Sequence, residues 1–297
     1  MSQVYSKLLS GKGHGYPLWI PEPNENLSHE YRQRGVSIGD VGIITPDGGF
    51  DFLFNVYLLA NNPIHINGVP EGFLKLDLDQ GDVFKQSYMH PPGAIISTGQ
   101  AFKCALGVEG SSKAAPSVNF LTLVFRRIFI VLPLRIPPFG AGIIFNIQFQ
   151  AAAGAILWLP EGASREDLLN VDPLKALAEM QAPLWQHFAG GRGRGQRRLF
   201  VVTGCDKAST FAELSFTAES RTGSISATVS AGLVDGKFSL EISSTNYHSY
   251  DSRVGQRPQS STPNLCVFVR GFEINPGNGL FRRIGKGVKL TPVLVGT

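Results

Sequence analysis

Strict alternation of apolar and polar residues over 222–244 constrains the fold of this chain more than any other feature. Ile225, Ala227 and Val229 are apolar, whereas the residues between them are serine or threonine. A period of two residues indicates a β-strand with one buried face, because successive side chains of a strand point to opposite faces. A second run with the same period begins at Phe238. The two runs therefore predict an antiparallel β-hairpin.

The dipeptide Asp235-Gly236 stands between the two runs and favours a tight turn, because such pairs supply the positive φ angles that primed turns require. A two-residue loop at this dipeptide fixes the predicted register. The expected partners are Leu233 with Phe238, Ala231 with Leu240, and Val229 with Ile242. An isolated hairpin is marginally stable in water. We therefore expect the rest of the chain to pack around this hairpin.

A second hairpin is predicted where Val41–Thr45 and Phe50–Leu59 flank the turn residues Pro46–Gly49. Its second strand carries apolar residues on both faces, with Phe50, Phe52, Phe54 and Val56 expected on one of them. Such a strand is predicted to lie in the interior of a sheet. Further strands are predicted at 93–98, 198–203, 212–219, 265–274 and 290–295, with 265–274 in a central position.

Helical patterns are confined to two segments of the chain. A short helix is predicted over 24–34, with Asn24 or Asn26 as its cap. A longer helical segment is predicted over about 164–189, with Ser164 as a cap and a new start at Asp172-Pro173. Pro183 is expected to kink or split this segment. The sequence thus predicts an α+β fold of mainly antiparallel sheet, with the segment 164–189 covering one side.

The composition favours a fold rich in strands and turns. The 297 residues include 34 glycines, and only 17% of the chain is charged. The net charge of +4 is too small to indicate a nucleic-acid partner. No linker divides the chain, so we expect a single domain over 1–297, with residues 1–14 loose.

The segment 118–160 is strongly apolar and contains no charged residue from Ile136 to Pro160. That length could span a bilayer as a helix. Prolines, glycines and the alternation of Phe145 and Ile147 with polar residues instead favour buried strands.

The three cysteines, Cys104, Cys205 and Cys266, are odd in number and far apart in the sequence. They are interpreted as free thiols in a reducing compartment. The first 17 residues lack an apolar stretch typical of a signal peptide. Together these observations predict a cytoplasmic protein.

Three adjacent residues, Cys205, Asp206 and Lys207, follow a predicted strand at a position where enzymes often place reactive groups. Cys205 could act as a nucleophile with His187 or His248 as its base. A structural thiol is the alternative, because nothing in the sequence shows a stabilised thiolate. These residues are weak candidates for a catalytic site.

A basic loop is predicted between the long helix and the strand that follows it. It contains four arginines among glycines, namely Arg192, Arg194, Arg197 and Arg198. Such a loop could bind phosphate or an anionic surface, or it could simply be solvated. A second basic segment, 281–289, would strengthen the anion-binding hypothesis if the fold brought the two together.

The remaining motifs give weaker evidence for a functional site. Gly35–Gly39 matches the G-x-S-x-G pattern of a hydrolase, but that motif needs a strand before it and a helix after it, the reverse of the predicted order. Asp77, Asp79 and Asp82 lack the twelfth-position glutamate of a calcium loop. The six histidines show no zinc-ligand spacing. The sequence therefore predicts neither a metal nor a cofactor.

Several blocks of the chain resemble an uncharacterised group of predicted proteins from mushroom-forming fungi. These blocks are 16–24, 35–55, 154–162, 202–207 and 266–272. The resemblance covers most of the chain but implies no chemistry and no functional residue. In that group the region matching 119–135 is small and serine-rich, so the apolar run of this chain is a departure.

Two classes of function are expected from these observations. The first is a non-enzymatic interaction or defence-type protein, with a protein or an anionic membrane surface as its partner. The Ser/Thr-rich alternation over 222–244 is also typical of hairpins that pore-forming proteins insert into membranes. An ordinary soluble sheet is the favoured alternative, because soluble antiparallel sheets alternate in the same way. The second class is a cysteine- or carboxylate-dependent hydrolase.

Overall fold

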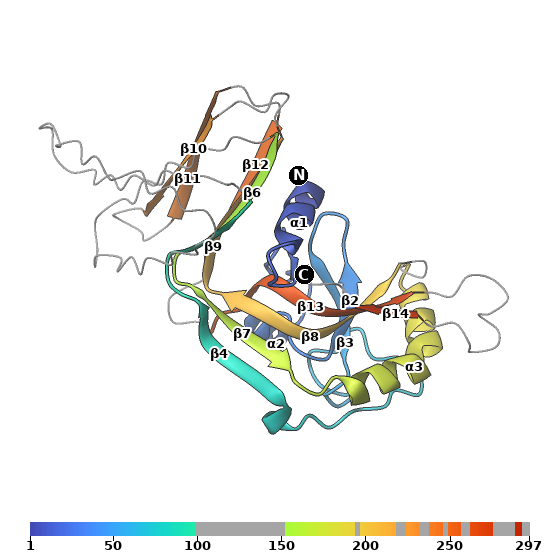
Figure 1. Cartoon of the computed structure of the whole chain (residues 1–297). Helices are drawn as coiled ribbons and strands as arrows, with labels where there is room; N and C mark the ends of the chain where they lie inside the picture. Colours follow the sequence, from blue (N-terminus) through green and yellow to red (C-terminus); the bar gives the residue numbers. More distant parts are fainter. Residues whose placement is uncertain are drawn as a thin grey trace, which may run out of the picture.

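The computed structural model describes residues 1–98, 152–193, 197–217, 224–231, 238–245, 249–256, 262–275 and 289–292. Antiparallel sheets dominate it, and three α-helices pack beside them, which confirms the predicted α+β class. A larger sheet forms the body of the molecule, and strands of the two smaller sheets project from one end of it (Figure 1).

The larger sheet has eight strands and is built around β8 (Leu199–Ala208) and β13 (Leu265–Asn275), which pair along most of their length. Both strands bury side chains on both faces, which explains their central position. The prediction that 265–274 is central is confirmed. The remaining strands are β1 (Tyr16–Pro17), β2 (Asp40–Ile44), β3 (Phe50–Asn55), β4 (Val83–His90), β7 (Ala163–Leu168) and β14 (Lys289–Pro292).

A second sheet has four strands in the order β12, β9, β6, β5. Their bounds are β12 (Ser249–Gln256), β9 (Thr210–Thr217), β6 (Ala153–Leu159) and β5 (Ala94–Ser97). The third sheet is the pair β10 (Ser224–Ala231) and β11 (Phe238–Thr245). Because β8 runs almost directly into β9, the first two sheets share a continuous stretch of chain.

The predicted hairpin at 222–244 forms, but two expectations about it are wrong. Ala231 pairs with Phe238 and Val229 with Leu240, so the register differs by two residues from the predicted one. A shift of two keeps the same positions on each face of the hairpin. The turn at Asp235-Gly236 lies outside the described residues. The hairpin is also a separate sheet at the periphery, and the chain packs around β8 and β13 instead.

The second predicted hairpin is confirmed as β2 and β3, joined by a turn in which Thr45 N–H donates to the carbonyl of Gly49. Its strand β3 is an edge strand rather than the interior strand predicted. The segment after β3 covers this edge, where Asn55 N–H donates to Nε2 of His65. The residues expected on one face also separate, because Phe52 and Phe54 belong to different core clusters.

The first residues of the chain were predicted to be loose, and this prediction is wrong. They form α1 (Ser2–Ser10), which buries Tyr5 and Leu9 completely. These two residues are four positions apart and therefore lie on one face of a helix. They pack against Leu157 and Phe211 of the second sheet and Phe268 of the larger one. Helix α1 thus fills the junction between the two sheets (Figure 1).

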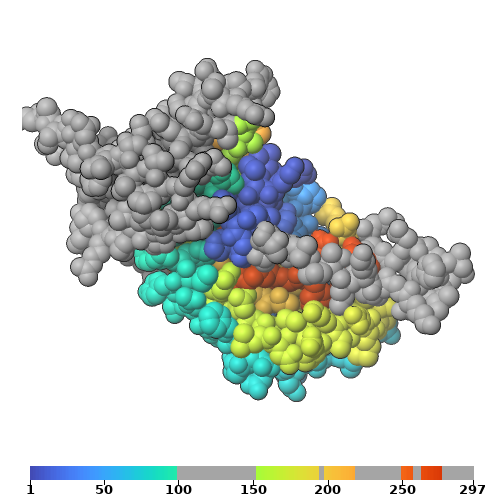
Figure 2. Space-filling view, in the orientation of Figure 1, coloured from blue at the N-terminus to red at the C-terminus, as the bar shows by residue number. Residues whose placement is uncertain are grey.

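The helical segment predicted over 164–189 is shorter at its start. Ser164 lies in strand β7, and α3 runs over Asp172–Gly190 with proline at its first turn, as the Asp172-Pro173 pair predicted. Pro183 lies inside this helix without splitting it. Buried α3 residues such as Leu174 and Trp185 pack on the larger sheet. The helix therefore covers one side of the sheet as predicted, and part of β13 stays visible between α3 and the N-terminal residues (Figure 2).

The short helix α2 (His29–Arg34) begins later than predicted, because Ser28 rather than Asn24 or Asn26 caps it. Most of the apolar segment 118–160 lies outside the described residues, and its last part is strand β6. The helices that the structure describes include none long and apolar enough to cross a bilayer.

Candidate functional site

The three adjacent residues predicted as weak catalytic candidates all lie in β8, but the strand separates them. Cys205 and Lys207 contact the loop that follows α2, where the Cys205 thiol donates to the carbonyl of Val36 at 3.5 Å. Asp206 contacts His90, at the end of β4, and two arginines. Alternation along a strand directs neighbouring side chains to opposite faces. The three residues therefore do not form one constellation.

Cys205 is completely buried beside a second buried thiol, Cys266. The hydrogen bond with Cys266 lowers the pKa of Cys205, whereas burial raises the pKa of Cys266 well above its usual value. Among the described residues, no histidine is hydrogen-bonded to either thiol. His187 is exposed on α3, and His248 lies outside the described residues. Cys205 therefore has the surroundings of a structural thiol.

Lys207 holds the loop between α2 and β2. Its Nζ donates to the carbonyl of Arg34 at 3.0 Å and to Oγ of Ser37 at 3.1 Å. Ser37 is the serine of the G-x-S-x-G match, and the structure confirms the order that argued against a nucleophile there, with helix α2 before it and strand β2 after it. The lysine and serine together anchor this loop to β8.

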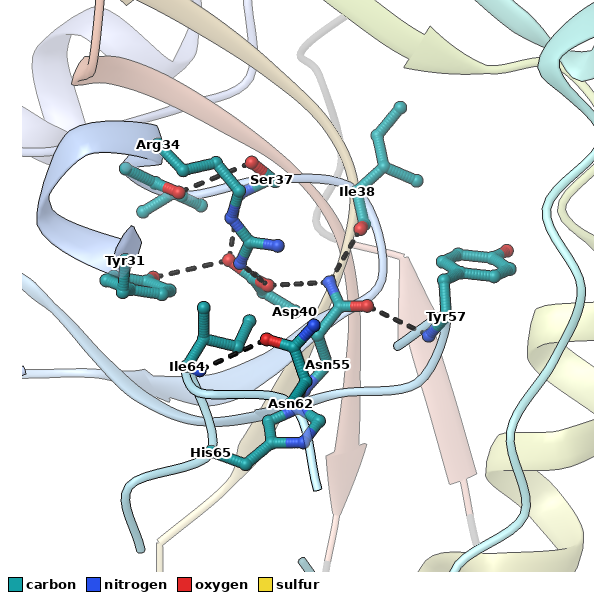
Figure 3. A network of polar contacts seen from close by, with 12 residues as sticks. Tyr31, Arg34, Ser37, Ile38, Asp40, Asn55, Tyr57, Asn62, Ile64 and His65 are labelled. Atoms are coloured by element: carbon teal, nitrogen blue, oxygen red, sulfur yellow. Dashed lines mark hydrogen bonds and ion pairs between the residues drawn. The ribbon is translucent and has the colours of Figure 1, made fainter. Parts of the chain in front are cut away.

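A buried polar network lies beside this loop and is centred on Asp40 (Figure 3). The Asp40 carboxylate accepts hydrogen bonds from Arg34, Asn55, Tyr31 and the backbone N–H of Ser37. Burial raises the pKa of Asp40, and the charge of Arg34 opposes this rise. The bonds from Arg34 and Tyr31 connect α2 to β2, the bond from Asn55 connects β3 to β2, and the bond from Ser37 holds the loop between α2 and β2. The network therefore fixes these three elements to one another.

The most highly charged buried centre of the described chain surrounds Asp206. Its Oδ2 lies 2.8 Å from Nε2 of His90. Its Oδ1 accepts from Nη1 of Arg270 at 2.8 Å and from Nε of Arg165 at 3.1 Å. Burial alone would raise the pKa of Asp206, but the bond with His90 and the charges of Arg270 and Arg165 lower it. Asp167 completes the cluster through its ion pair with Arg270.

His14 lies against this centre. Its ring packs edge-to-face on the His90 ring, with centroids 4.7 Å apart, and its carbonyl accepts from Nη1 of Arg270. Burial lowers the pKa of His14 to about 4, and the proximity of His90 contributes to this. Its Nδ1 is buried and has no hydrogen-bond partner in the described part of the chain. A neutral imidazole with a free ring nitrogen therefore faces a carboxylate and a second imidazole.

A second candidate site is the strand arrangement at the projecting end. Strand β9 pairs with β12, and the hairpin β10–β11 is inserted between them in the sequence. The four strands thus make one hairpin nested inside another, and Figure 1 shows them extending away from the larger sheet. This nesting was not predicted, because the sequence pattern identified the inner hairpin alone.

A buried ion pair ties the base of this arrangement to the body. Glu213 of β9 is completely buried and lies 3.5 Å from Nε of Arg253, its partner residue in β12. Arg253 also donates to both carboxylate oxygens of Glu22. Burial raises the pKa of Glu213 well above its usual value, outweighing the attraction of Arg253. Arg253 therefore connects the middle of the β9–β12 pair to Glu22, in the segment that follows β1.

The basic loop lies at the far end of the molecule from this hairpin, beyond α3 (Figure 1). Arg192 stacks on the ring of Phe188 at 4.5 Å and donates to the carbonyl of Asn67. Arg198 forms an ion pair with Glu273 at 3.1 Å. Arg197 is exposed, and Arg194 and the basic segment 281–288 lie outside the described residues. Anion binding by the loop stays a prediction.

Neither comparison with known proteins supplied a relative. A scan against protein-family models gave no match for this chain, and a search of the curated proteins also gave none. The function must therefore be argued from the geometry.

Proposed function

We propose that this protein is a non-enzymatic, membrane-acting protein whose hairpin β10–β11 inserts into lipid bilayers. The observation that carries the proposal is the nesting of this alternating hairpin between the paired strands β9 and β12. Strands that cross a bilayer must have every backbone group paired, and a continuous antiparallel hairpin pairs one side of each strand within the chain. Side-by-side copies of the chain would pair the other side.

The register of the hairpin supports this proposal. Across the two strands, Val229 is opposite Leu240 and Ala227 is opposite Ile242. The intervening pairs join serine or threonine with serine or glutamate, as Thr228 does with Glu241. One set of paired positions is therefore apolar except for Ser244, opposite Ile225, and the other set is uncharged or acidic, the alternation that a strand between lipid and water requires.

Strand length sets a requirement for insertion. Each of β10 and β11 has 8 residues, slightly fewer than the roughly 9–11 that a spanning strand needs. The chain continues on both sides toward β9 and β12, which supply additional paired residues. A membrane-disrupting hairpin would suit the defence-type role expected from the sequence, and anionic lipid is the proposed partner.

The hydrolase alternative has no observation in its favour. Cys205, Asp206 and Lys207 are buried and divided between two faces of β8. We further propose a cytoplasmic location, because the adjacent thiols Cys205 and Cys266 are both free and a reducing compartment would keep them so.

Dye release from lipid vesicles tests the proposed function. The purified full chain should release an encapsulated dye, and more from anionic than from neutral vesicles, because its net charge of +4 favours an anionic surface. Heat-denatured protein at the same concentration serves as the control. Absence of release from both kinds of vesicle would remove the proposal.

A further inference from the structure

We propose that His14, His90 and Asp206 form a binding site for a divalent transition-metal ion such as Zn²⁺. One ligand atom from each of the three residues lies within 4.8 Å of the other two. Two imidazoles and a carboxylate are a donor set that suits zinc and its neighbours rather than calcium or magnesium, which prefer oxygen alone.

The spacing of the ligand atoms is close to that of a metal site. Metal–ligand bonds of about 2.0–2.2 Å in a tetrahedral site place ligand atoms roughly 3.3 Å apart. His90 Nε2 and Asp206 Oδ2 are 2.8 Å apart already. The ligand nitrogen of His14 lies within 4.8 Å of the other two ligand atoms, so it would move inward by up to about 1.5 Å to complete the set. The hydrogen bond between His90 and Asp206 would also open by about 0.5 Å, so that both ligand atoms face the ion instead of each other.

The backbone next to His14 is packed closely enough to keep its ring beside His90. Gly15 has a φ of +117°, and a Cβ there would lie 2.7 Å from the carbonyl oxygen of Val269. Only glycine therefore lets this loop lie against β13 and hold His14 beside His90. The unpartnered Nδ1 of His14 is independent support, because a buried ring nitrogen without a partner costs free energy that a ligand would recover.

The surroundings of Asp206 resemble the outer shell of a metal site. The two arginines occupy Oδ1 and leave Oδ2 directed at His90. Arg270 also binds the carbonyl of His14, so one guanidinium orients two of the three proposed ligands. Such outer contacts fix the orientation of metal ligands and support their affinity. The site is therefore preorganised on the carboxylate side.

The charges nearby limit the affinity. Arg165 and Arg270 balance Asp206 and Asp167, so a dication would add uncompensated positive charge to the cluster. Three protein ligands also leave a fourth position for water or a further ligand. We therefore expect weaker binding than in a closed four-ligand site. A bound ion would connect the chain after α1, the end of β4 and β8, next to the junction of the two sheets.

Metal binding by the untagged full chain tests this site. Equilibrium dialysis against Zn²⁺, followed by metal analysis, should find one ion per chain for the wild type. His14→Ala, which removes a half-buried side chain, should lower the affinity by at least about tenfold. His187→Ala, which removes an exposed histidine of α3, should bind like the wild type. Melting temperatures in a chelator confirm that both variants fold.

A second readout uses Co²⁺ in place of Zn²⁺, because its visible absorption reports the coordination geometry. The wild type and His187→Ala should give the intense bands of a four-coordinate site, and His14→Ala should lose them. Failure of the wild type to take up Zn²⁺ stoichiometrically would overturn the proposal, as would unchanged binding by His14→Ala.

Discussion

Replacing Val229 by aspartate should reduce dye release from vesicles to the level of vesicles alone, whereas Thr228→Asp should retain most of the release. The two positions are adjacent in β10, but Val229 is opposite Leu240 and Thr228 is opposite Glu241. A charge on the lipid face of a spanning strand costs on the order of 2 kcal/mol, and every copy in an assembly bears that cost. A charge on the watery face costs little.

The comparison between the two variants separates insertion from general destabilisation. Both substitutions add one negative charge at the same depth of the hairpin, so surface electrostatics and solubility change equally. Far-ultraviolet circular dichroism and melting temperature should show the same folded protein in both. Equal loss of release in the two variants, or equal retention, would contradict a hairpin with one face in lipid.

Replacing Asp206 by asparagine should lower the free energy of unfolding by about 3 kcal/mol, the typical cost of removing one partner from a buried ion pair. The substitution keeps the shape of the side chain but leaves Arg165 and Arg270 without their shared buried carboxylate. Asp77→Asn is the matched control, because Asp77 is exposed and solvent screens its ion pair with Lys75, so this substitution should leave the stability almost unchanged. Urea denaturation measures both.

The pH dependence of stability gives this prediction a second readout. The fold lowers the pKa of Asp206 below its unfolded value. Its contribution is therefore fully present above the unfolded pKa of about 4 and is lost as the pH falls through the folded pKa. Asp206→Asn should remove this part of the acid sensitivity. A variant with wild-type stability at neutral pH and an unchanged acid profile would show that the cluster contributes little.

Local patterns were sufficient to predict both hairpins and the central strand 265–274. Two-residue alternation is a property of a few adjacent residues, so it is visible without knowledge of the partner strand. The register of β10 and β11 could not be predicted from local patterns. The apolar pattern is the same after a shift of two residues, so the length of the connection 232–237 decides between the two registers. The pairing of β9 with β12 could not be predicted either, because it joins strands that the whole inner hairpin separates in the sequence.

Strand β7 shows how tertiary contacts override a local signal. Ser164, followed by arginine and two acidic residues, is typical of a helix start, and the sequence was interpreted in that way. In the structure the same residues pair with β4 and β8, where Arg165 binds the buried Asp206. Glu166 therefore pairs with Lys85 of β4, and Asp167 pairs with Arg270 of β13, rather than completing a helix cap.

The candidate metal site could not be predicted from the sequence, because tertiary contacts bring its ligands together. Ligand spacing identifies metal sites when the ligands share one element, but His14, His90 and Asp206 come from three distant segments. The spacing of the histidines therefore did not decide whether a site exists. Helix α1 was missed although Val4, Tyr5, Leu8 and Leu9 have the spacing of one helix face, because a run of nine residues is short and was interpreted as a polar segment.

The most direct test of membrane insertion is a fluorescence scan along β10. An environment-sensitive dye is attached to single cysteines placed at positions 225–231, in a chain with Cys104→Ser, since Cys205 and Cys266 are completely buried. On addition of anionic vesicles, the emission should shift to the blue at positions 225, 227, 229 and 231 and stay unchanged at the positions between them. Unchanged emission at every position, or a shift without alternation, would contradict insertion of this hairpin into lipid.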